Sequence, residues 1–428
     1  MKIVRLKAKN FKSFKNLDVA LDDFNLVIGS NASGKSNFVS LFKFLHDIGS
    51  TGLDDAISQQ GGIEWIRNVN LPASEELEIE MHMKSSVVYH PLTTKQDERG
   101  LEIPDICYKF RIKFLKQKDS FEVVEENLES PFRIVKMGKN DQKDKPIELL
   151  DTGKIVLKRE SDDSLTTSLH FEKNILSDKE KIFLASAGQM KLPSVINSRQ
   201  ELVILKGFMA SVSSYFLHLF LADIQFFDID PKSSKKAYSI TGKKELEPDG
   251  SNLSLVLGRM LKNREKKETL QEIIKTLLPF INGFSVEQQD DRSLITYLSE
   301  TYCHKKLIPA SFISGGTINL LSLLVALYTK PIGSPTILIE EPDKNLHPSL
   351  ISKLVEVLKD ISETRNKQMV ITTHNPQIVK HVKLENIILI SRKGCYSKVS
   401  KPIESAEVKE FLKEDLGVED LYLQNLLE

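Results

Sequence analysis

The chain has 428 residues, of which 40% are hydrophobic and 28% are charged, as in an ordinary soluble globular protein. Lysine plus arginine equals aspartate plus glutamate, at 59 each, so no overall positive charge draws the protein to nucleic acid. Its three cysteines have no metal-type spacing, which argues against a disulfide scaffold or a zinc site and for a reducing cytosol. No apolar stretch reaches the about 18 residues of a membrane span, so we expect a cytoplasmic protein without a membrane partner.

The first part of the chain predicts strands, a loop and a helix. Residues 3–8 and 17–21 alternate apolar and polar side chains, as half-buried strands do, and the segment 10–14 joins them. An apolar strand over residues 26–28 then leads into a glycine-containing loop. Apolar residues at helical spacing over 38–45 predict a helix directly after this loop.

The loop over residues 29–36 has the pattern G-x-x-x-x-G-K-S between the predicted strand and helix. Gly29 and Gly34 let successive backbone N–H groups point at a polyphosphate, and the helix presents its positive N-terminal end to the same anion. Lys35 is expected to reach the β- and γ-phosphates, and the Ser36 hydroxyl to ligate Mg²⁺. The sequence therefore predicts that a nucleoside triphosphate is bound by Gly29, Ser30, Asn31, Ala32, Ser33, Gly34, Lys35, Ser36 and Asn37.

The middle of the chain changes character. From residue 77 to 171, runs of alternating apolar and charged residues are separated by turn residues, which predicts an antiparallel sheet with one wet face. The polar tract 137–145 is expected to be a mobile hairpin tip. Residues 201–221 and 251–281 predict helices, and strands return near Phe284.

The C-terminal part alternates helices with buried strands, as a parallel sheet covered on both faces does. Helices are expected over residues 317–328 and 348–361, followed later by a helical tail. Strands are expected over residues 336–339, 369–373, 386–390 and 395–399.

Two of these strands end in residues that suit phosphate chemistry. The strand over 336–339 runs into Glu340 and Glu341, and in phosphate-loop enzymes the first such acid holds the Mg²⁺ shell while the next orients the attacking water. His374 follows the strand over 369–373, at the strand end where ligands bind, and is expected to contact the γ-phosphate. The alternatives, an acidic surface turn and a structural histidine, stay open on these residues alone.

A second glycine-containing segment precedes the helix over 317–328. Ser314, Gly315 and Gly316 form a small helix N-terminus, which is a further anion site. A plain N-capped helix is the alternative interpretation of the same residues.

Taken together, these segments resemble the ABC-type ATPases of the branch that contains RecF and the SMC-like proteins, and more narrowly a group of bacterial predicted ATPases called AAA-type. The resemblance is carried by the phosphate loop and by N-F-K-S-F at 10–14, L-E-P-D-G-S-N-L at 246–253, S-G-G-T at 314–317, E-E-P at 340–342, L-H-P at 346–348 and T-T-H-N-P at 372–376. It implies an α/β P-loop NTPase of the ABC-ATPase head type, with an antiparallel β-rich subdomain and a helical insertion.

On this resemblance we expect an ATPase core formed by residues 1–84 and 284–428. Between its two parts lie an inserted β-rich region over 85–200 and a helical subdomain over 201–283. The helix of Ser314 and the double-acid strand fall in the second part of the core.

The resemblance also implies a composite site. Two subunits are expected to associate head to tail around two ATP molecules, with the segment 314–316 of one subunit closing on the γ-phosphate held by the other. Lys12 is expected to contribute to nucleotide binding. Gln60 is expected to link Mg²⁺ to the neighbouring subdomain, although its neighbour Gln59 is an equal candidate.

These expectations describe an enzyme that hydrolyses ATP to ADP and phosphate and acts as a switch between two arrangements of a homodimer or higher homo-oligomer. The family analogy adds a role in bacterial anti-phage defence or DNA maintenance. The segment after His374 is too short for an appended TOPRIM-type nuclease domain. Any nuclease or toxin effector is therefore expected to be a separate polypeptide.

Two other functions compete with this one. The first is DNA binding in repair, as in RecF, because a basic cluster lies between the predicted helices, although such clusters are usually solvated faces. The cluster consists of Lys232, Lys235, Lys236, Lys243 and Lys244, followed by Lys262, Arg264, Lys266 and Lys267. The second, a subunit of a transport ATPase, is disfavoured by the large inserted region and by the segment 10–14.

Overall fold

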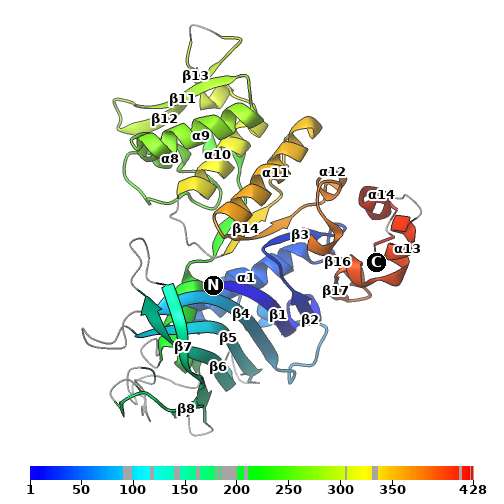
Figure 1. Cartoon of the computed structure of the whole chain (residues 1–428). Coiled ribbons are helices and arrows are strands. Elements are labelled where there is room, and N and C mark those ends of the chain that lie inside the picture. Colours follow the sequence, from blue (N-terminus) through cyan, green and yellow to red (C-terminus); the bar gives the residue numbers. More distant parts are fainter. Residues whose placement is uncertain are drawn as a thin grey trace. The chain divides into compact units, whose positions relative to one another are not determined.

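A computed structural model describes residues 1–89, 99–115, 120–138, 145–160, 164–178, 181, 184, 200–206, 211–303, 306–329, 336–413, 417–424 and 426–427. The chain forms two compact units, coloured along the sequence in Figure 1. Unit 1 consists of Met1–Leu21, Ala32–Ile224 and Ser391–Val399, and unit 2 of Asp22–Asn31, Gln225–Ile390 and Ser400–Glu428. Most of the predicted hairpin tip, residues 139–144, lies outside the described residues, and the predicted domain limits stay a prediction.

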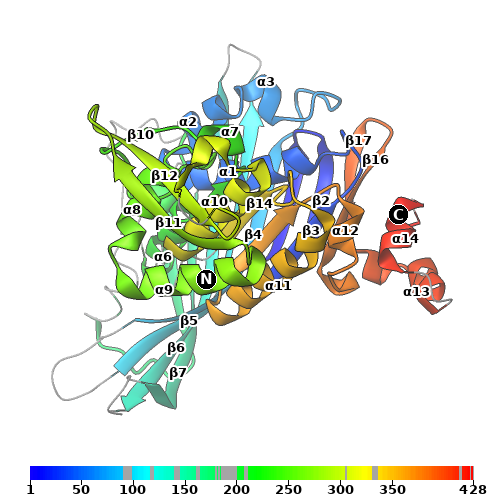
Figure 2. The same ribbon diagram turned by 90° about the horizontal axis from the view of Figure 1, so that it is seen from above.

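Unit 1 is built on a large antiparallel sheet with the strand order β8-β7-β6-β5-β4-β1-β2. Apolar and polar residues alternate along these strands, so one face is buried and the other is solvated, which confirms the sheet predicted from the alternation. The long strands β5, β6 and β7 run side by side in both views (Figures 1 and 2). The strands are β1 (Lys2–Phe11), β2 (Phe14–Ala20), β4 (Leu77–Tyr89), β5 (Arg99–Phe114), β6 (Phe121–Gly138), β7 (Lys145–Arg159) and β8 (Leu165–Phe171), and β17 (Tyr396–Ser400) pairs with β2.

The helices of unit 1 pack through aromatic and glycine contacts. Phe44 of α1 lies against Phe11 of β1, with ring centroids 5.9 Å apart. A Cβ on Gly49 of α1 would lie 2.8 Å from the Leu221 side chain of α6, so glycine permits the two helices to approach closely. These helices are α1 (Lys35–Ser50), α2 (Leu53–Gln59), α3 (Ile63–Ile66), α5 (Val203–Lys206) and α6 (Val212–Ala222).

The helix predicted over 201–221 corresponds to α5 and α6. Ser211 begins α6, because its side chain accepts a hydrogen bond from the Ser214 N–H at 3.1 Å and so caps the helix. Residues 207–210, between the two helices, lie outside the described residues.

Unit 2 contains a parallel sheet with the order β16-β3-β15-β14-β9. Its central strands are buried along almost their whole length, as expected for a sheet covered on both faces. Its strands are β3 (Phe24–Ile28), β9 (Gln225–Phe227), β14 (Thr336–Glu340), β15 (Gln368–Thr372) and β16 (Ile387–Lys393). The strand β9 was not predicted, because three residues are too short for a periodic signal.

A group of helices and a small antiparallel sheet complete unit 2, and the apolar residues of both join one core cluster. The sheet pairs β10 (Tyr238–Ser239), β11 (Ile281–Gln288), β12 (Ser293–Glu300) and β13 (Ile308–Pro309). The helices are α7 (Pro231–Ser234), α8 (Leu253–Leu261), α9 (Arg264–Leu277), α10 (Gly315–Thr329), α11 (Pro348–Thr364), α12 (Pro376–Val379), α13 (Ala406–Lys413) and α14 (Val418–Leu423). These elements, with the phosphate loop between β3 and α1, confirm the predicted α/β class.

The single helix predicted over 251–281 was wrong. Two helices, α8 and α9, occupy this range, and β11 already begins at Ile281. Asn263 separates the helices because its side chain accepts a hydrogen bond from the Lys266 N–H at 3.0 Å and caps α9. Residues 262–269, between Leu261 and Leu270, are all polar, and this break in the apolar pattern marks the boundary between the two helices.

In the part of the chain that the structure describes, the helices are all too short or too polar to span a bilayer.

A buried carboxylate joins the large sheet of unit 1 to α5. Glu126 of β6 is 0% exposed, and its Oε1 accepts hydrogen bonds from the Tyr108 hydroxyl at 2.7 Å and the Ile204 N–H at 3.0 Å. Its Oε2 has no hydrogen-bond partner among the described residues. Burial raises the pKa of Glu126 to about 7, although these hydrogen bonds and the nearby Arg159 act in the opposite direction.

We predict that this carboxyl makes the chain less stable as the pH rises. Between its ordinary pKa of 4.5 and about 7, folded Glu126 keeps a proton that the unfolded chain has released. The free energy of unfolding should therefore fall by roughly 3 kcal/mol across this window. Glu126→Gln should remove this decrease, as measured by urea unfolding at about pH 5 and about pH 8.

The half-buried Glu122, on the same strand, supplies the matched control. Glu122→Gln should leave the decrease in stability unchanged. A Glu126→Gln variant with the same pH dependence as the original chain would contradict the prediction.

Candidate functional site

The predicted phosphate loop connects β3 to α1 and has the backbone geometry of a tight anion-binding turn. Ala32 and Gly34 have positive φ values of 61° and 117°, and Gly34 is the N-cap of α1. A Cβ on Gly34 would lie 2.3 Å from the Ser397 Oγ, so this position requires glycine. The buried Ser33 Oγ has no hydrogen-bond partner among the described residues. An orphaned hydroxyl beside the N-terminus of a long helix fits a phosphate ligand.

A small set of serines holds the second half of this loop. The Ser397 hydroxyl donates to the Ser33 carbonyl at 2.5 Å, and its Oγ lies 2.8 Å from the Ser13 Oγ. The Asn37 side-chain amide donates to the same Ser13 hydroxyl at 2.7 Å. Ser13 belongs to the N-F-K-S-F segment, so one role of that segment is to support the loop. Sequence reasoning missed Ser397, because a single serine in a short strand gives no signal.

Lys12 lies in the turn between β1 and β2, with a positive φ of 46°. Its N–H donates to the Ile66 carbonyl at 2.9 Å, which fixes the turn. Burial, and then the charge of Lys43, lower the pKa of Lys12. A partly desolvated cation of this kind suits an anionic ligand, and the predicted contact of Lys12 with nucleotide stays a prediction.

The two candidate glutamines lie at the C-terminal end of α2. Gln60 is the C-cap of this helix, and its side chain bonds to the Asp47 carboxylate of α1. The Gln59 amide donates to the Thr51 hydroxyl at 3.4 Å. Both contacts join α2 to the end of α1 within unit 1, and the predicted contact of Gln60 with Mg²⁺ stays a prediction.

The carboxylates and the histidine lie at one edge of the parallel sheet of unit 2. Glu340 is the last residue of β14, and Glu341 follows it with a positive φ of 45°. The Glu341 N–H donates to the Thr372 carbonyl of β15 at 2.9 Å, which holds this unusual backbone conformation. The Glu341 Oε1 lies 2.9 Å from the His374 Nδ1. The structure thus brings together Glu341 and His374, which the sequence placed at the ends of two separate strands.

Two charged residues that sequence reasoning missed extend this group. Lys344 Nζ lies 3.6 Å from the Glu341 Oε2 and 2.8 Å from the Asp228 Oδ1. Burial lowers the pKa of Lys344, but the interactions with Asp228 and Glu341 outweigh it and raise the pKa. Asp228 directly follows β9, which is parallel to β14, so it reaches the same edge of the sheet. The strand before Asp228 has only three residues, so the sequence carried no periodic signal for it.

The L-E-P-D-G-S-N-L segment forms a fixed loop beside Asp228. The buried Asn252 side chain accepts from the Glu247 N–H and donates to the Glu245 carbonyl, both at 2.8 Å. The Asp228 N–H donates to the Pro248 carbonyl at 2.9 Å. The segment therefore acts as a support for the acidic edge.

The N-terminus of α10 packs on the loop that follows the two glutamates. Ser314 caps the helix by accepting from the Thr317 N–H at 3.1 Å. A Cβ on Gly316 would lie 2.4 Å from the Asn345 carbonyl oxygen, so only glycine permits this approach. The Asn319 amide donates to the carbonyls of Pro342 at 3.1 Å and Lys344 at 3.0 Å. The N-terminus of α10 and the loop after Glu341 are thus packed together within unit 2.

The predicted site residues divide between the two units. Unit 2 holds Gly29, Ser30, Asn31, Ser314, Gly315, Gly316, Glu340, Glu341 and His374, and unit 1 holds Lys12, Ala32, Ser33, Gly34, Lys35, Ser36, Asn37 and Gln60. The donor set fits Mg²⁺, because the Ser36 hydroxyl and the Glu340 carboxylate are hard oxygen ligands. A metal shared by these two residues stays a prediction.

Comparison with known proteins agrees with these motifs. A family model described as the AAA ATPase domain matches residues 1–379. The DNA replication and repair protein RecF of Chlamydia caviae is 31% identical over 121 residues, which are 27% of this chain and 29% of that protein. An uncharacterized ABC transporter ATP-binding protein/permease of Saccharomyces cerevisiae is 26% identical over 131 residues, which are 30% of this chain and 10% of that protein. Each of the two matches thus spans less than a third of the relative's own length.

A solved structure also aligns with most of the chain. It is an SMC head bound to the C-terminal winged-helix domain of ScpA, at 14% identity and a TM-score of 0.48, and the alignment covers 94% of this chain and 98% of that one.

We predict that Asn319→Ala loosens the acidic loop. The substitution leaves the carbonyls of Pro342 and Lys344 without their buried donor, which should lower the free energy of unfolding by about 1–3 kcal/mol. Urea unfolding of the variant measures this decrease.

Ser322, one turn further along α10, provides the matched control. Its buried hydroxyl has no hydrogen-bond partner among the described residues, so Ser322→Ala should be neutral or stabilising. Equal stability of Asn319→Ala and the original chain would show that Asn319 does not hold the loop.

Proposed function

The chain belongs to the AAA ATPase domain family, as its motifs predicted, and from this premise we propose that it binds and hydrolyses ATP and switches between two arrangements of a head-to-tail dimer. The contact of Glu341 with His374, on a loop packed against the Ser-Gly-Gly helix, is the observation that carries this proposal. In this proposal, a candidate base, a polar contact for phosphate and an anion-binding helix end share one support.

Nucleotide binding rests on the loop between β3 and α1. The backbone N–H groups from Gly29 to Asn37 and the N-terminus of α1 offer positive partial charge to the phosphates, and Lys35 adds a full charge. Ser36, Glu340 and Gln60 would hold Mg²⁺, which offsets phosphate charge when bound. Lys12 adds a further cation to the nucleotide site in this proposal.

Hydrolysis rests on Glu341. His374 and Lys344 contact its two carboxylate oxygens and hold the side chain in one orientation, so it can position a water molecule and accept a proton from it. The His374 side chain is 57% exposed, so one part of the ring stays accessible to a γ-phosphate. Lys344 also balances the charge of the carboxylate.

The dimer rests on the face that carries the α10 N-terminus. Ser314 is exposed and Gly315 is half-buried at the start of a helix of 15 residues, whose N-terminal end favours an anion. The neighbouring Phe312 is 82% exposed, as expected for a side chain that a second subunit covers. ATP held by one subunit would be closed by this face of the other, and hydrolysis would remove contacts made only in the closed state.

The biological setting in this proposal is bacterial anti-phage defence or DNA maintenance, with a separate nuclease or toxin as effector. The RecF relative supports the DNA-maintenance setting, and the defence setting rests on family analogy. We further propose that the protein acts in the cytoplasm as a homodimer or higher homo-oligomer.

The proposed switch predicts a mass change that depends on ATP. Glu341→Gln keeps the shape of the side chain but removes the carboxylate that positions water, so ATP should stay bound and turnover should fall by several orders of magnitude. Light scattering of this variant should show a dimer with ATP and Mg²⁺ and a smaller species without them.

Lys35→Ala, added to the same variant, supplies the control, because removal of the phosphate-binding cation should abolish the mass change. Retained ATP affinity in Lys35→Ala would refute the phosphate-loop assignment. Turnover at the original rate in Glu341→Gln would show that another residue positions the water, and a constant mass would refute ATP-driven dimerisation.

A second candidate function, binding of duplex DNA, is favoured by the RecF relative and by exposed lysines. Lys232, Lys236, Lys243 and Lys244 are exposed around α7 and β10, and the Lys243 Nζ lies 3.1 Å from the Glu247 carboxylate. Exposed cations of this kind contact phosphates without reading sequence.

If this surface binds DNA, affinity should fall steeply with salt. Lys235→Glu with Lys236→Glu should lower the salt slope by about 2, because each lysine would neutralise one phosphate. Fluorescence anisotropy with a labelled duplex measures both quantities. Lys380→Glu with Lys383→Glu makes the same charge change elsewhere on unit 2 and should have little effect. No binding at low salt would exclude this function.

A further inference from the structure

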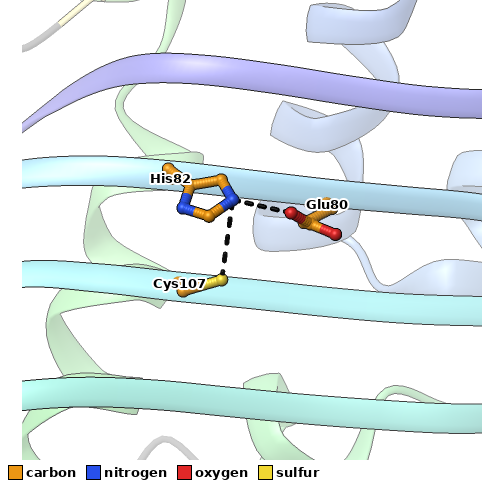
Figure 3. A group of neighbouring side chains, drawn as sticks. All are labelled: Glu80, His82 and Cys107. Carbon is orange, nitrogen blue, oxygen red and sulfur yellow. Dashed lines mark hydrogen bonds and ion pairs between the residues drawn. The ribbon is translucent and has the colours of Figure 1, made fainter. Parts of the chain in front are cut away.

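We propose that Glu80, His82 and Cys107, on the large sheet of unit 1, form a binding site for a divalent transition-metal ion of the zinc class. Figure 3 shows the three side chains turned toward one another, with the imidazole between the carboxylate and the thiol. One ligand atom from each residue lies within 4.8 Å of the others. The site belongs to neither the phosphate loop nor the acidic edge of unit 2.

The sheet places these ligands by its register. Glu80 and His82 are two positions apart on β4, so both side chains point to the same face. Cys107 lies directly opposite His82 on the antiparallel strand β5, and such cross-strand partners share a face. The strands on either side, β1 and β6, pair with β4 and β5 and make this a rigid interior part of the sheet.

The distances are close to those of a metal site. The His82 Nε2 lies 2.6 Å from the Glu80 Oε1 and 3.9 Å from the Cys107 Sγ. In a tetrahedral zinc site, with bonds of about 2.0 Å to nitrogen or oxygen and about 2.3 Å to sulfur, ligand atoms are roughly 3.3–3.6 Å apart. Side-chain movements of less than about 1 Å therefore suffice, and rotamer adjustments supply them.

The donor set selects the kind of metal. A thiolate and an imidazole favour zinc and similar transition metals over Mg²⁺ or Ca²⁺, which prefer oxygen alone. The His82 side chain is 38% exposed and the Glu80 side chain 18%, so an ion can enter and a water molecule can supply the fourth ligand. The position is therefore typical of a site with three protein ligands and one open position.

Neighbouring charges allow the exchange of a proton for a metal. The Lys7 Nζ lies 2.7 Å from the Glu80 Oε1. Binding would form a metal–sulfur bond, release the Cys107 thiol proton to solvent and let the partly exposed Lys7 ammonium turn away from Glu80 into solvent. Glu129, opposite Cys107 on β6, is paired with Lys154 at 2.5 Å, so the next carboxylate on this face is already balanced.

Cobalt(II) is the probe that separates this site from the proposed ATP site. A thiolate bound to Co²⁺ gives a near-ultraviolet charge-transfer band, and no residue of the predicted ATP site is a cysteine. Titration of the reduced, full-length protein with Co²⁺ should produce this band, and stoichiometric Zn²⁺ should remove it by competition. Absence of the band would overturn the proposal.

Two variants and one matched control assign the ligands. Cys107→Ser should abolish the band, whereas the double variant Cys303→Ser with Cys395→Ser, which keeps only Cys107, should retain it. His82→Gln keeps the thiol, and removal of a ligand should weaken Co²⁺ binding by at least about tenfold, since even groups that only orient ligands contribute that much. A band that persists in Cys107→Ser, or affinity unchanged in His82→Gln, would contradict the site.

Discussion

The parallel register of β3, β15 and β14 is the constraint on which the candidate site depends. Glu340 pairs with Thr372, and Thr372 pairs with Val27, so the three strands end at the same level. Gly29, Glu341 and His374, which follow these strand ends, therefore lie at one edge of the sheet. Backbone hydrogen bonds fix this alignment, and the side chains add to it the contact between Glu341 and His374. Glu341 and His374 are 33 positions apart in the sequence, and the strand register is what brings their side chains into contact.

Around this edge, unit 2 forms a connected polar group. Lys344 forms ion pairs with both Asp228 and Glu341. The Asn319 side chain connects the start of α10 to the same loop by a hydrogen bond. In the proposed switch, an anion bound at the α10 N-terminus and the residue that positions water would share one rigid support. Such a shared support is what a nucleotide needs in order to favour one arrangement of two subunits over another.

Unit 1 uses its antiparallel sheet in two different ways. The buried face carries Glu126, whose carboxylate is held between Tyr108 and α5 and is costly to ionise. The solvated face carries ladders of opposite charges and the proposed metal site at His82 and Cys107. Both features follow from the same alternation of side chains, because successive residues of a strand point to opposite faces.

The sequence by itself determined the local features: the phosphate loop, the alternating strands of unit 1, the buried strands of unit 2 and the α/β class, because each depends on spacing within a few residues. Only the tertiary structure decided which distant residues meet. The strand β9 brings Asp228 to the acidic edge, and Ser397 contacts the loop at Ser33. The cysteine spacing argued against a zinc site, yet the pairing of β4 with β5 placed Cys107 opposite His82. Strand register and side-chain packing set these contacts, and neither leaves a signal at short range along the chain.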